Sequence, residues 1–230
     1  MKKIVVLTGA GVSAESGIKT FRDADGLWEG HDVMEVASPQ GWRKNMELVL
    51  DFYNQRRRQL LEVKPNAGHF SLVELEKHFE VSIITQNVDD LHERAGSTNI
   101  IHLHGELLKA RSTKDPSLIY DWAKDILPGD ICPLGSQLRP HIVWFGEAVP
   151  MIEAAAMETM TADAVIIVGT SMQVYPAAGL VGFAEKAQRI YYVDPKPAIN
   201  YELSQAASLS VIAEPATTGV PKVVKELLGQ

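Results

Sequence analysis

Cysteine is nearly absent from the sequence, since Cys132 is the only one among 230 residues. A single thiol excludes a disulfide within the chain, and this scarcity suits the reducing cytoplasm. Long hydrophobic runs are also missing, because none approaches the roughly 18 apolar residues that cross a bilayer. The first apolar run, residues 4–7, leads directly into glycines, which favours a buried strand over a secretory signal. We therefore expect a cytoplasmic protein that does not associate with a membrane.

Basic residues are outnumbered by acidic ones. The chain has 22 lysines and arginines against 29 aspartates and glutamates, which gives a formal net charge of −7. Proteins that bind a nucleic-acid backbone usually present a basic surface, so we expect no nucleic-acid partner. The length suffices for one sizeable core, or for one core with a small appended module.

Short β-branched runs alternate with segments of helical periodicity. The expected strands cover residues 3–9, 81–87, 99–105, 164–170 and 189–195, and each ends in a polar or glycine-containing turn. The expected helices cover residues 45–63, 68–79, 151–160, 177–188 and 221–229. This alternation predicts an α/β fold, with a Rossmann-like, mainly parallel sheet and helices on both of its faces.

Two stretches break the alternation and look like insertions. Residues 26–66 have helical character with no intervening strand, and residues 105–137 are mixed, with several turn residues. We expect a single domain over residues 1–230. Its large Rossmann-like part would comprise residues 1–25, 67–104 and 138–230, and the two inserts would form a small module beside it.

The first expected strand ends in GAGVSAESG, a glycine turn that leads into a helix. Gly9 and Gly11 would let the backbone approach a ligand, and a helix N-terminus favours phosphate. Ala14 stands where the full G-x-G-x-x-G pattern has its third glycine, and the lysine of a Walker loop is missing. A tight strand-to-helix turn without a ligand is the alternative.

A second possible cradle ends the expected strand at residues 164–170. It consists of Gly169, Thr170 and Ser171, whose hydroxyls could bind phosphate oxygens. Asp194, at the end of another expected strand, could accept a hydrogen bond from a ribose hydroxyl. Ligands of open α/β sheets lie at the carboxyl ends of strands, so these turns together predict a dinucleotide site.

Three further stretches carry a specific resemblance: ITQNVDDLHERAG at 84–96, IHLHGEL at 101–107 and LRPHIVWFGE at 138–147. With GAGVSAESGIKTFRDADGLW at 9–28 and VGTS at 168–171, they make the chain resemble the sirtuins, the NAD-dependent protein-lysine deacylases. The similarity extends over about residues 3–228 and is greatest to the bacterial CobB type. It implies NAD as the cofactor and acylated lysines of proteins as the substrate.

The resemblance implies roles for individual residues of the dinucleotide site. Asn87 and Asp89 would position the nicotinamide ribose and the carboxamide, with Gln86 beside them. Phe21 and Arg22, in KTFR, would cover the reacting ribose and its phosphate side. The dinucleotide cradle would include Ala10, Ser13, Thr170 and Ser171.

His104 corresponds to the general base of the family. In the implied reaction the acyl-lysine carbonyl oxygen attacks the ribose carbon that bears nicotinamide, and a base takes a proton from a ribose hydroxyl. Histidine suits that task near neutral pH. Water would complete the transfer, and the products would be nicotinamide, free lysine and 2′-O-acyl-ADP-ribose. By strand alternation His104 shares a face with His102, so a core histidine is the alternative.

Substrate contacts are implied on two segments. Val143, Trp144, Phe145 and Gly146 correspond to the strand that pairs with the substrate backbone and lines the acyl-lysine tunnel. The second segment contains a tyrosine and an arginine three residues apart, and therefore on one helix face. A guanidinium binds a carboxylate through two parallel hydrogen bonds, and a phenol adds a donor. The tyrosine and the arginine of this second segment are Tyr53 and Arg56.

In the family, a Tyr-x-x-Arg pair at this place accompanies the removal of succinyl or malonyl groups. We therefore expect activity toward succinyl-, malonyl- and acetyl-lysine, with Ala37 leaving room for the longer chains. The neighbouring Arg57 and Arg58 should be exposed, or paired with Asp51 or Glu62. A solvated helix face is the alternative for the whole run of arginines.

Sirtuins usually carry a zinc module, held by four cysteines, between HGEL and LRP. Here Ser112 stands at the first cysteine position, Asp115 stands at its partner spacing, and CPLGS keeps only Cys132. Zinc needs thiolate or imidazole ligands in a tetrahedral array, so we expect no metal. The insert would then be held by packing of its apolar residues, which are Leu118, Ile119, Tyr120, Trp122, Ile126 and Leu127.

Two other functions would use the same cleft. One is ADP-ribosyl transfer to a protein side chain, and the other is a non-catalytic sensor of NAD or ADP-ribose. A conventional NAD dehydrogenase is disfavoured, because the acidic residues about 20 positions after the glycine turn lie in an irregular segment. These residues are Glu29 and Asp32. We expect the protein to be a monomer.

Overall fold

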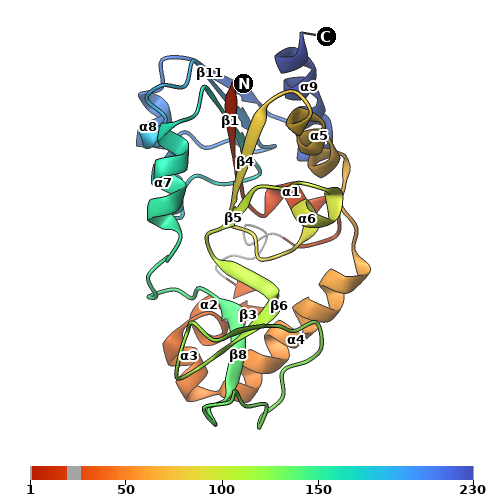
Figure 1. Ribbon diagram of the computed structural model, residues 1–230, viewed down its shortest axis with the longest axis vertical. Helices are drawn as coiled ribbons and strands as arrows, with labels where there is room; N and C mark the ends of the chain where they lie inside the picture. The colour runs from red at the N-terminus through yellow and green to blue at the C-terminus, as the bar shows by residue number, and fades with distance from the viewer. Residues whose placement is uncertain (1, 20–26, 230) are drawn as a thin grey trace.

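The structure, a computed structural model, describes residues 2–19 and 27–229 (Figure 1). Its strands are β1 (Lys3–Thr8), β2 (Leu27–Trp28), β3 (His31–Asp32), β4 (Glu80–Thr85), β5 (Ile100–His102), β6 (Gly105–Ser112), β7 (Ile119–Asp121), β8 (Leu138–Ile142), β9 (Ala164–Val168), β10 (Arg189–Val193) and β11 (Leu209–Ile212). Its helices are α1 (Gly11–Ala14), α2 (Val33–Val36), α3 (Pro39–Lys44), α4 (Met46–Glu62), α5 (Ala67–Glu76), α6 (Leu91–Ala95), α7 (Ile152–Met160), the 3₁₀ helix η2 (Ala177–Phe183), α8 (Tyr201–Ser204) and α9 (Ala216–Leu228). In this part of the chain no helix is both long enough and apolar enough to span a membrane.

The larger part of the molecule is a parallel sheet with the strand order β11-β10-β9-β1-β4-β5. The chain moves from β1 outward to β4 and β5, returns to β9 on the other side of β1, and then moves outward to β10 and β11. The strand order therefore reverses between β1 and β9. In open α/β sheets a ligand crevice forms at the carboxyl ends of the two strands at this point.

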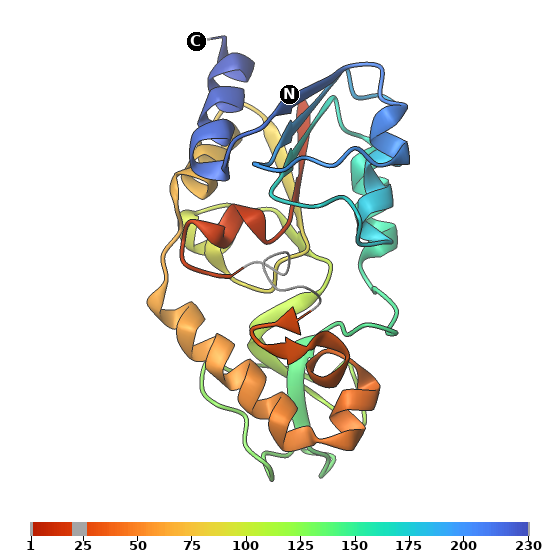
Figure 2. The same ribbon diagram turned by 180° about the vertical axis from the view of Figure 1, so that it is seen from behind.

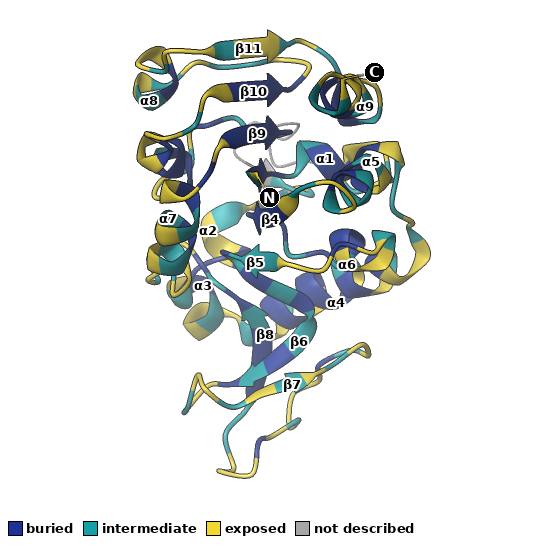
Figure 3. Ribbon diagram, turned by 45° about the horizontal axis from the view of Figure 1, so that its top comes forward, coloured by how far each residue is buried: buried dark blue, intermediate teal, exposed yellow. Residues whose placement is uncertain are grey.

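Helices cover both faces of this sheet, as Figure 3 shows. α5 and α9 pack together on one face, whereas α7, η2 and α8 lie on the other. Successive side chains of a strand point to opposite faces. Accordingly, Ile4 and Val6 lie in the core under α5 and α9, and Val5 and Leu7 lie in the core on the opposite side. The predicted Rossmann-like fold class is confirmed.

The five predicted strands of the large sheet all form, as β1, β4, β5, β9 and β10. The sixth, β11, was missed because LSVI is short and none of its four residues is fully buried. An edge strand pairs on one side only, so it lacks the continuous apolar run that marks the inner strands.

The smaller module lies below the sheet in Figure 1 and contains an antiparallel sheet of order β7-β6-β8. Two sequence expectations are corrected here. Residues 26–66 are not free of strands, because β2 and β3 form a small hairpin. Residues 138–142 were assigned to the large part, but β8 pairs with β6 and so belongs to the small sheet.

The apolar residues expected to hold the second insert fall into two groups. Ile126 is buried in a cluster with Leu50, and Tyr120 and Trp122 pack against that cluster. Ile119 and Leu127 are exposed, so packing involves fewer of these side chains than expected.

Helix α4 packs against β6 and β8 in the small module, and the chain continues from its end to α5 of the larger part (Figure 2). It begins where the Asn45 side chain accepts a hydrogen bond from the amide of Leu48, which is the usual N-cap arrangement. The expectation for Arg57 is wrong, because its side chain is fully buried. Arg57 Nε donates to the carbonyl of Leu107 at 3.0 Å, and a terminal nitrogen donates to Asn54 Oδ1 at 2.7 Å.

Arg58 is exposed, as expected, but its partner is Asp125 at 2.5 Å rather than Asp51 or Glu62. The two neighbouring arginines thus have different environments. Burial lowers the pKa of Arg57 to about 10, against the opposing influence of the Asp125 carboxylate.

This contrast gives a stability prediction. Arg57→Ala should lower the free energy of unfolding by about 3 kcal/mol, because it takes the side-chain donor away from the buried carbonyl of Leu107 and one of two donors away from Asn54 Oδ1. Arg58→Ala is the matched control and should change it by no more than about 0.5 kcal/mol, since exposed ion pairs contribute little. Urea denaturation of both variants measures the difference, and equal losses would contradict the structural role assigned to Arg57.

Candidate functional site

A cleft of about 850 Å³ lies between the large sheet and the small module. It is lined by the turns that follow β1, β4, β9 and β10, by α4, and by the segment after β8. The structure therefore brings together nearly all the candidate residues of the sequence, namely Gly9, Ala10, Gly11, Tyr53, Arg56, Gln86, Asn87, Asp89, His104, Val143, Trp144, Phe145, Gly146, Gly169, Thr170, Ser171 and Asp194. Phe21 and Arg22 fall outside the described residues.

The two glycine turns meet at the reversal of strand order. The amide of Gly11 donates to the carbonyl of Gly169 at 2.8 Å, and the amide of Gly9 donates to Val168 at 3.0 Å. A Cβ at position 11 would lie 2.6 Å from the Gly169 Cα, and Gly169 itself has φ +61°. Glycine is thus needed for the turns to pack together, and the same packing leaves a cradle open to the cleft. α1 has only four residues, so its macrodipole adds little to anion binding.

A chain of buried polar groups fixes the turn that follows β4. Asn87 Nδ2 donates to Ser13 Oγ at 3.2 Å, and Ser13 Oγ donates to Asp89 Oδ2 at 2.9 Å. The other Asp89 oxygen accepts from the amide of Leu91 at 3.1 Å. Ser13 therefore lies beneath the cleft and orients Asn87 and Asp89. Burial raises the pKa of Asp89 to about 6, although the hydrogen bonds from Leu91 and Ser13 oppose the shift.

His104 lies between β5 and β6, where the chain leaves the large sheet and enters the small module. Its Nδ1 is 3.0 Å from the carbonyl of Gln86. A carbonyl can only accept a hydrogen bond, so Nδ1 of the neutral ring carries the proton and Nε2 is left as a base. Burial lowers the pKa of His104, and the bond to Gln86 partly opposes this, so the neutral imidazole is favoured at neutral pH.

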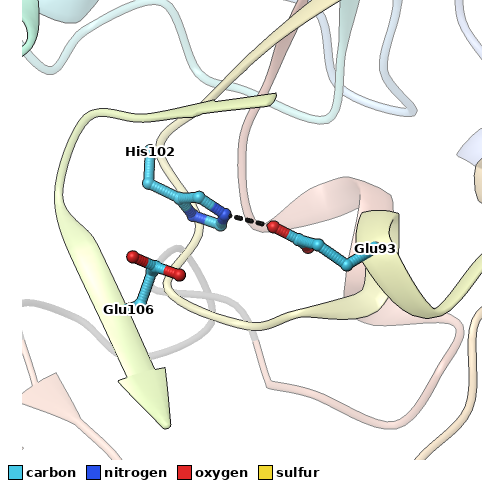
Figure 4. A group of neighbouring side chains, drawn as sticks. All are labelled: Glu93, His102 and Glu106. Carbon is cyan, nitrogen blue, oxygen red and sulfur yellow. Dashed lines mark hydrogen bonds and ion pairs between the residues drawn. The ribbon is translucent and has the colours of Figure 1, made fainter. Parts of the chain in front are cut away.

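His102 has a different environment from His104, although strand alternation predicted that the two share a face. Figure 4 shows its ring directed toward Glu93 of α6, with Glu106 of β6 nearby. His102 Nε2 is 2.6 Å from Glu93, and Nδ1 is 3.3 Å from the carbonyl of Asn87. Burial opposes the charged ring, but the hydrogen bond to Glu93 and the charges of Glu93 and Glu106 together outweigh it, so the pKa of His102 is raised. His102 thus ties α6 to the Asn87 turn and does not line the cleft.

The strand expected over residues 143–146 does not form, because β8 ends at Ile142. The backbone turns away there: the amide of Val143 donates to the carbonyl of His104, and that of Phe145 to the carbonyl of Ala37. The amide of Trp144 donates to Glu147, whose carboxylate also pairs with a nearby arginine at 2.7 Å. This arginine, Arg139, lies 3.2 Å from the Trp144 ring centre.

The Tyr53 and Arg56 side chains both line the end of the cleft that lies in the small module, where α4 borders it. Tyr53 is fully buried, and its hydroxyl accepts a hydrogen bond from Trp144 Nε1 at 3.0 Å. Arg56 donates to the carbonyl of Phe52 at 2.8 Å and lies 3.7 Å from Glu29. The proximity of Glu29 to Arg56 was not predicted, because nothing in the sequence pairs a hairpin turn with a distant helix.

Where the resemblance places zinc cysteines, Ser112 and Cys132 form a hydrogen-bonded cluster with Ser136. Cys132 Sγ is 3.3 Å from Ser112 Oγ and 3.1 Å from Ser136 Oγ, and the two hydroxyls are 2.9 Å apart. Ser112 also accepts from the amide of Asp115 at 3.0 Å. One thiol and two hydroxyls do not supply the thiolate and imidazole ligands of structural zinc, so these residues do not fit the metal.

The fold and the cleft define an α/β protein with a dinucleotide-type crevice at a reversal of strand order. A model described as the Sir2 family matches residues 9–176. A Helicobacter pylori protein named NAD-dependent protein deacylase is 61% identical over 228 residues, which cover 99% of this chain and 98% of the relative. A Bacteroides thetaiotaomicron protein of the same name is 52% identical and covers 99% and 98%.

Solved structures agree with these relatives. A Sir2 homologue in complex with NAD is 39% identical, with a TM-score of 0.88 over 99% of this chain and 90% of that one. A variant of a Sir2 homologue with ADP-ribose is 38% identical, with a TM-score of 0.89 and coverage of 99% and 92%. The chain belongs to the Sir2 family, and the expected sirtuin resemblance is confirmed.

The raised pKa of Asp89 gives a prediction for stability against pH. A folded-state pKa of about 6 against an ordinary value of 3.8 means that this group costs stability as pH rises from about 4 to above 6. Asp89→Asn removes this cost, so between pH 5 and pH 8 the variant should gain about 1–1.5 kcal/mol relative to the unmodified protein. Urea denaturation at both pH values measures it, with the exposed Asp121→Asn as control. A pH-independent difference would contradict the shift.

Proposed function

We propose that this Sir2 protein is an NAD-dependent protein-lysine deacylase that removes succinyl, malonyl and acetyl groups. One observation carries the proposal: the Nε2 of His104 is left as a base, at the junction between the dinucleotide turns and the Tyr53–Arg56 end of the cleft. The relatives are named for this activity, and one solved Sir2 homologue variant is a complex with 2′-O-acetyl-ADP-ribose.

The cleft fits NAD on the geometry of its own residues, because the turns after β1 and β9 form an open cradle flanked by the polar groups of the β4 turn. When bound, NAD would supply the ribose carbon that the acyl-lysine carbonyl oxygen attacks as nicotinamide leaves, and the ribose 2′-hydroxyl that finally takes the acyl group. His104 would take a proton at Nε2, and the Gln86 carbonyl would stabilise the charged ring that results. Asn87 and Asp89, held by Ser13, would orient the nicotinamide end, and Asp194 would bind a ribose hydroxyl.

The other end of the cleft would hold the acyl group. Arg56 would bind the free carboxylate of a succinyl or malonyl chain, and the Tyr53 hydroxyl, already accepting from Trp144, would donate its own proton to it. Phe145 and Trp144 would border the lysine side chain. The substrate backbone would lie along residues 143–146.

We also propose that the small module holds no zinc and is stabilised by the hydrogen bonds among Ser112, Cys132 and Ser136 together with the cluster around Ile126. The absence of a nucleic-acid partner, the monomeric state and the cytoplasmic location stay predictions from the sequence.

The decisive test follows the products after incubation with NAD and acyl-lysine peptides. We expect free lysine peptide, nicotinamide and O-acyl-ADP-ribose by mass spectrometry, and a loss of about a hundredfold or more in His104→Ala, because the general base is removed. Metal analysis of the same sample should find no stoichiometric zinc. ADP-ribose attached to a protein side chain would favour the transferase alternative, and no nicotinamide release with any acyl peptide would favour the sensor.

The acyl preference has its own prediction. Arg56→Met should lower kcat/KM for a succinyl-lysine peptide by about a hundredfold and change that for the acetyl peptide by only a fewfold, because only the succinyl chain loses a charge-assisted hydrogen bond. Arg58→Met, two residues along the same helix and paired with Asp125, is the matched control and should affect neither. An equal loss of both activities in Arg56→Met would assign the arginine a structural role.

A further inference from the structure

The acyl end of the cleft already contains a carboxylate of the chain itself. Glu29 Oε2 lies 3.7 Å from a terminal nitrogen of Arg56, and the same oxygen accepts a hydrogen bond from Lys19 Nζ at 3.0 Å. All three side chains line the cleft. Glu29 and Arg56 are 14% and 16% exposed, so water screens their attraction only partly, whereas Lys19 is 71% exposed.

Arg56 is held in place without help from Glu29. It donates to the carbonyl of Phe52 at 2.8 Å, and its guanidinium carbon lies 4.1 Å from the centre of the Phe52 ring. Its Nε is buried and has no hydrogen-bond partner among residues 2–19 and 27–229. The 3.7 Å separation from Glu29 is too long for a hydrogen bond. The guanidinium of Arg56 therefore has N–H groups that form no hydrogen bond with Glu29. A carboxylate that lies closer than Glu29 would accept hydrogen bonds from them.

Glu29 occupies an unusual backbone position. It and Gly30 form the two-residue turn between β2 and β3, with φ of +51° and +82°. Such a turn needs positive φ at both positions, and asparagine or aspartate followed by glycine is the ordinary choice. A longer side chain such as glutamate is disfavoured there. Trp28 of the same hairpin packs edge-on against Phe52, with ring centres 5.0 Å apart, and so holds Glu29 near Arg56.

We propose that Glu29 is an internal competitor that a dicarboxylic acyl chain must displace from Arg56, so that Glu29 sets the preference between charged and neutral acyl groups. The inference rests on the proposed function of the Tyr53–Arg56 end of the cleft. An acetyl group leaves the Glu29–Arg56 pair in place. A succinyl or malonyl carboxylate takes over the guanidinium, and Glu29 remains with Lys19, which already binds the same oxygen.

The test is the kinetics of Glu29→Gln, which keeps the size of the side chain and removes its charge. We expect KM for the succinyl-lysine peptide to fall roughly three- to tenfold, because a partly screened like charge is removed beside the substrate carboxylate. The kcat values and the KM for the acetyl peptide should stay the same. Glu35→Gln is the matched control: Glu35 pairs with Lys44 on the outside of the module and should change nothing.

Two further variants keep the outcome decisive. Glu29→Asn suits the turn better and has a side chain too short to reach Arg56, so it should fold at least as well and lower the succinyl KM as Glu29→Gln does. Lys19→Ala leaves Glu29 with Arg56 alone and should raise the succinyl KM. This effect should vanish when Lys19→Ala is combined with Glu29→Gln, because the competitor is then gone.

Two results would overturn the inference. A higher succinyl KM in Glu29→Gln would mean that Glu29 positions Arg56 rather than competing for it, and an unchanged KM would mean that Glu29 has no influence on acyl choice. Either result leaves the proposed function intact if Arg56→Met still loses succinyl activity selectively. Failure of the Arg56→Met experiment would instead remove the acyl pocket itself.

Discussion

The amide of Gly11 and the carbonyl of Gly169 are 2.8 Å apart, and this hydrogen bond joins the turns that follow β1 and β9. It can form only because neither residue has a Cβ, since a methyl group at either position would enter the backbone of the other turn. The parallel strands bring both turns to one edge of the sheet, and the reversal of strand order leaves the crevice between them. The dinucleotide half of the cleft therefore depends on backbone contact more than on side-chain choice.

The second half of the cleft belongs to the small module, and His104 lies at the boundary. β5 ends at His102 and β6 begins at Gly105, so His104 is on the short link between the parallel and the antiparallel sheet. Its carbonyl accepts from the amide of Val143, and its Nδ1 faces the carbonyl of Gln86. The base is thus fixed from both sides by uncharged backbone groups, which orient the ring. Such support suits a group that must change protonation state without rearranging.

Periodicity and turn residues were sufficient to predict five of the six strands of the large sheet. Each inner strand is a continuous β-branched run that ends in a glycine or polar turn, and this signal is local. The small module was predicted less well, because its strands are held by pairing between distant segments. The β2–β3 hairpin has strands of two residues each, and β8 contains Pro140, so neither has a clear strand pattern. The two glycine turns and Asp194 were predicted from the ends of strands, whereas most other cleft residues were placed by the resemblance, and their roles are predictions.

The run Arg56, Arg57 and Arg58 shows why helix periodicity alone could not settle the site. Successive helical residues point about 100° apart, so three adjacent arginines must enter three environments. Arg56 faces the cleft and Glu29, Arg57 is buried against the carbonyl of Leu107, and Arg58 meets Asp125 at the surface. The segment containing Asp125 and the strand containing Leu107 lie on the insert of residues 105–137, which carries the only cysteine of the sequence. Arg57 and Arg58 therefore connect that insert to α4. Of the three arginines, Arg56 is the one that lines the cleft.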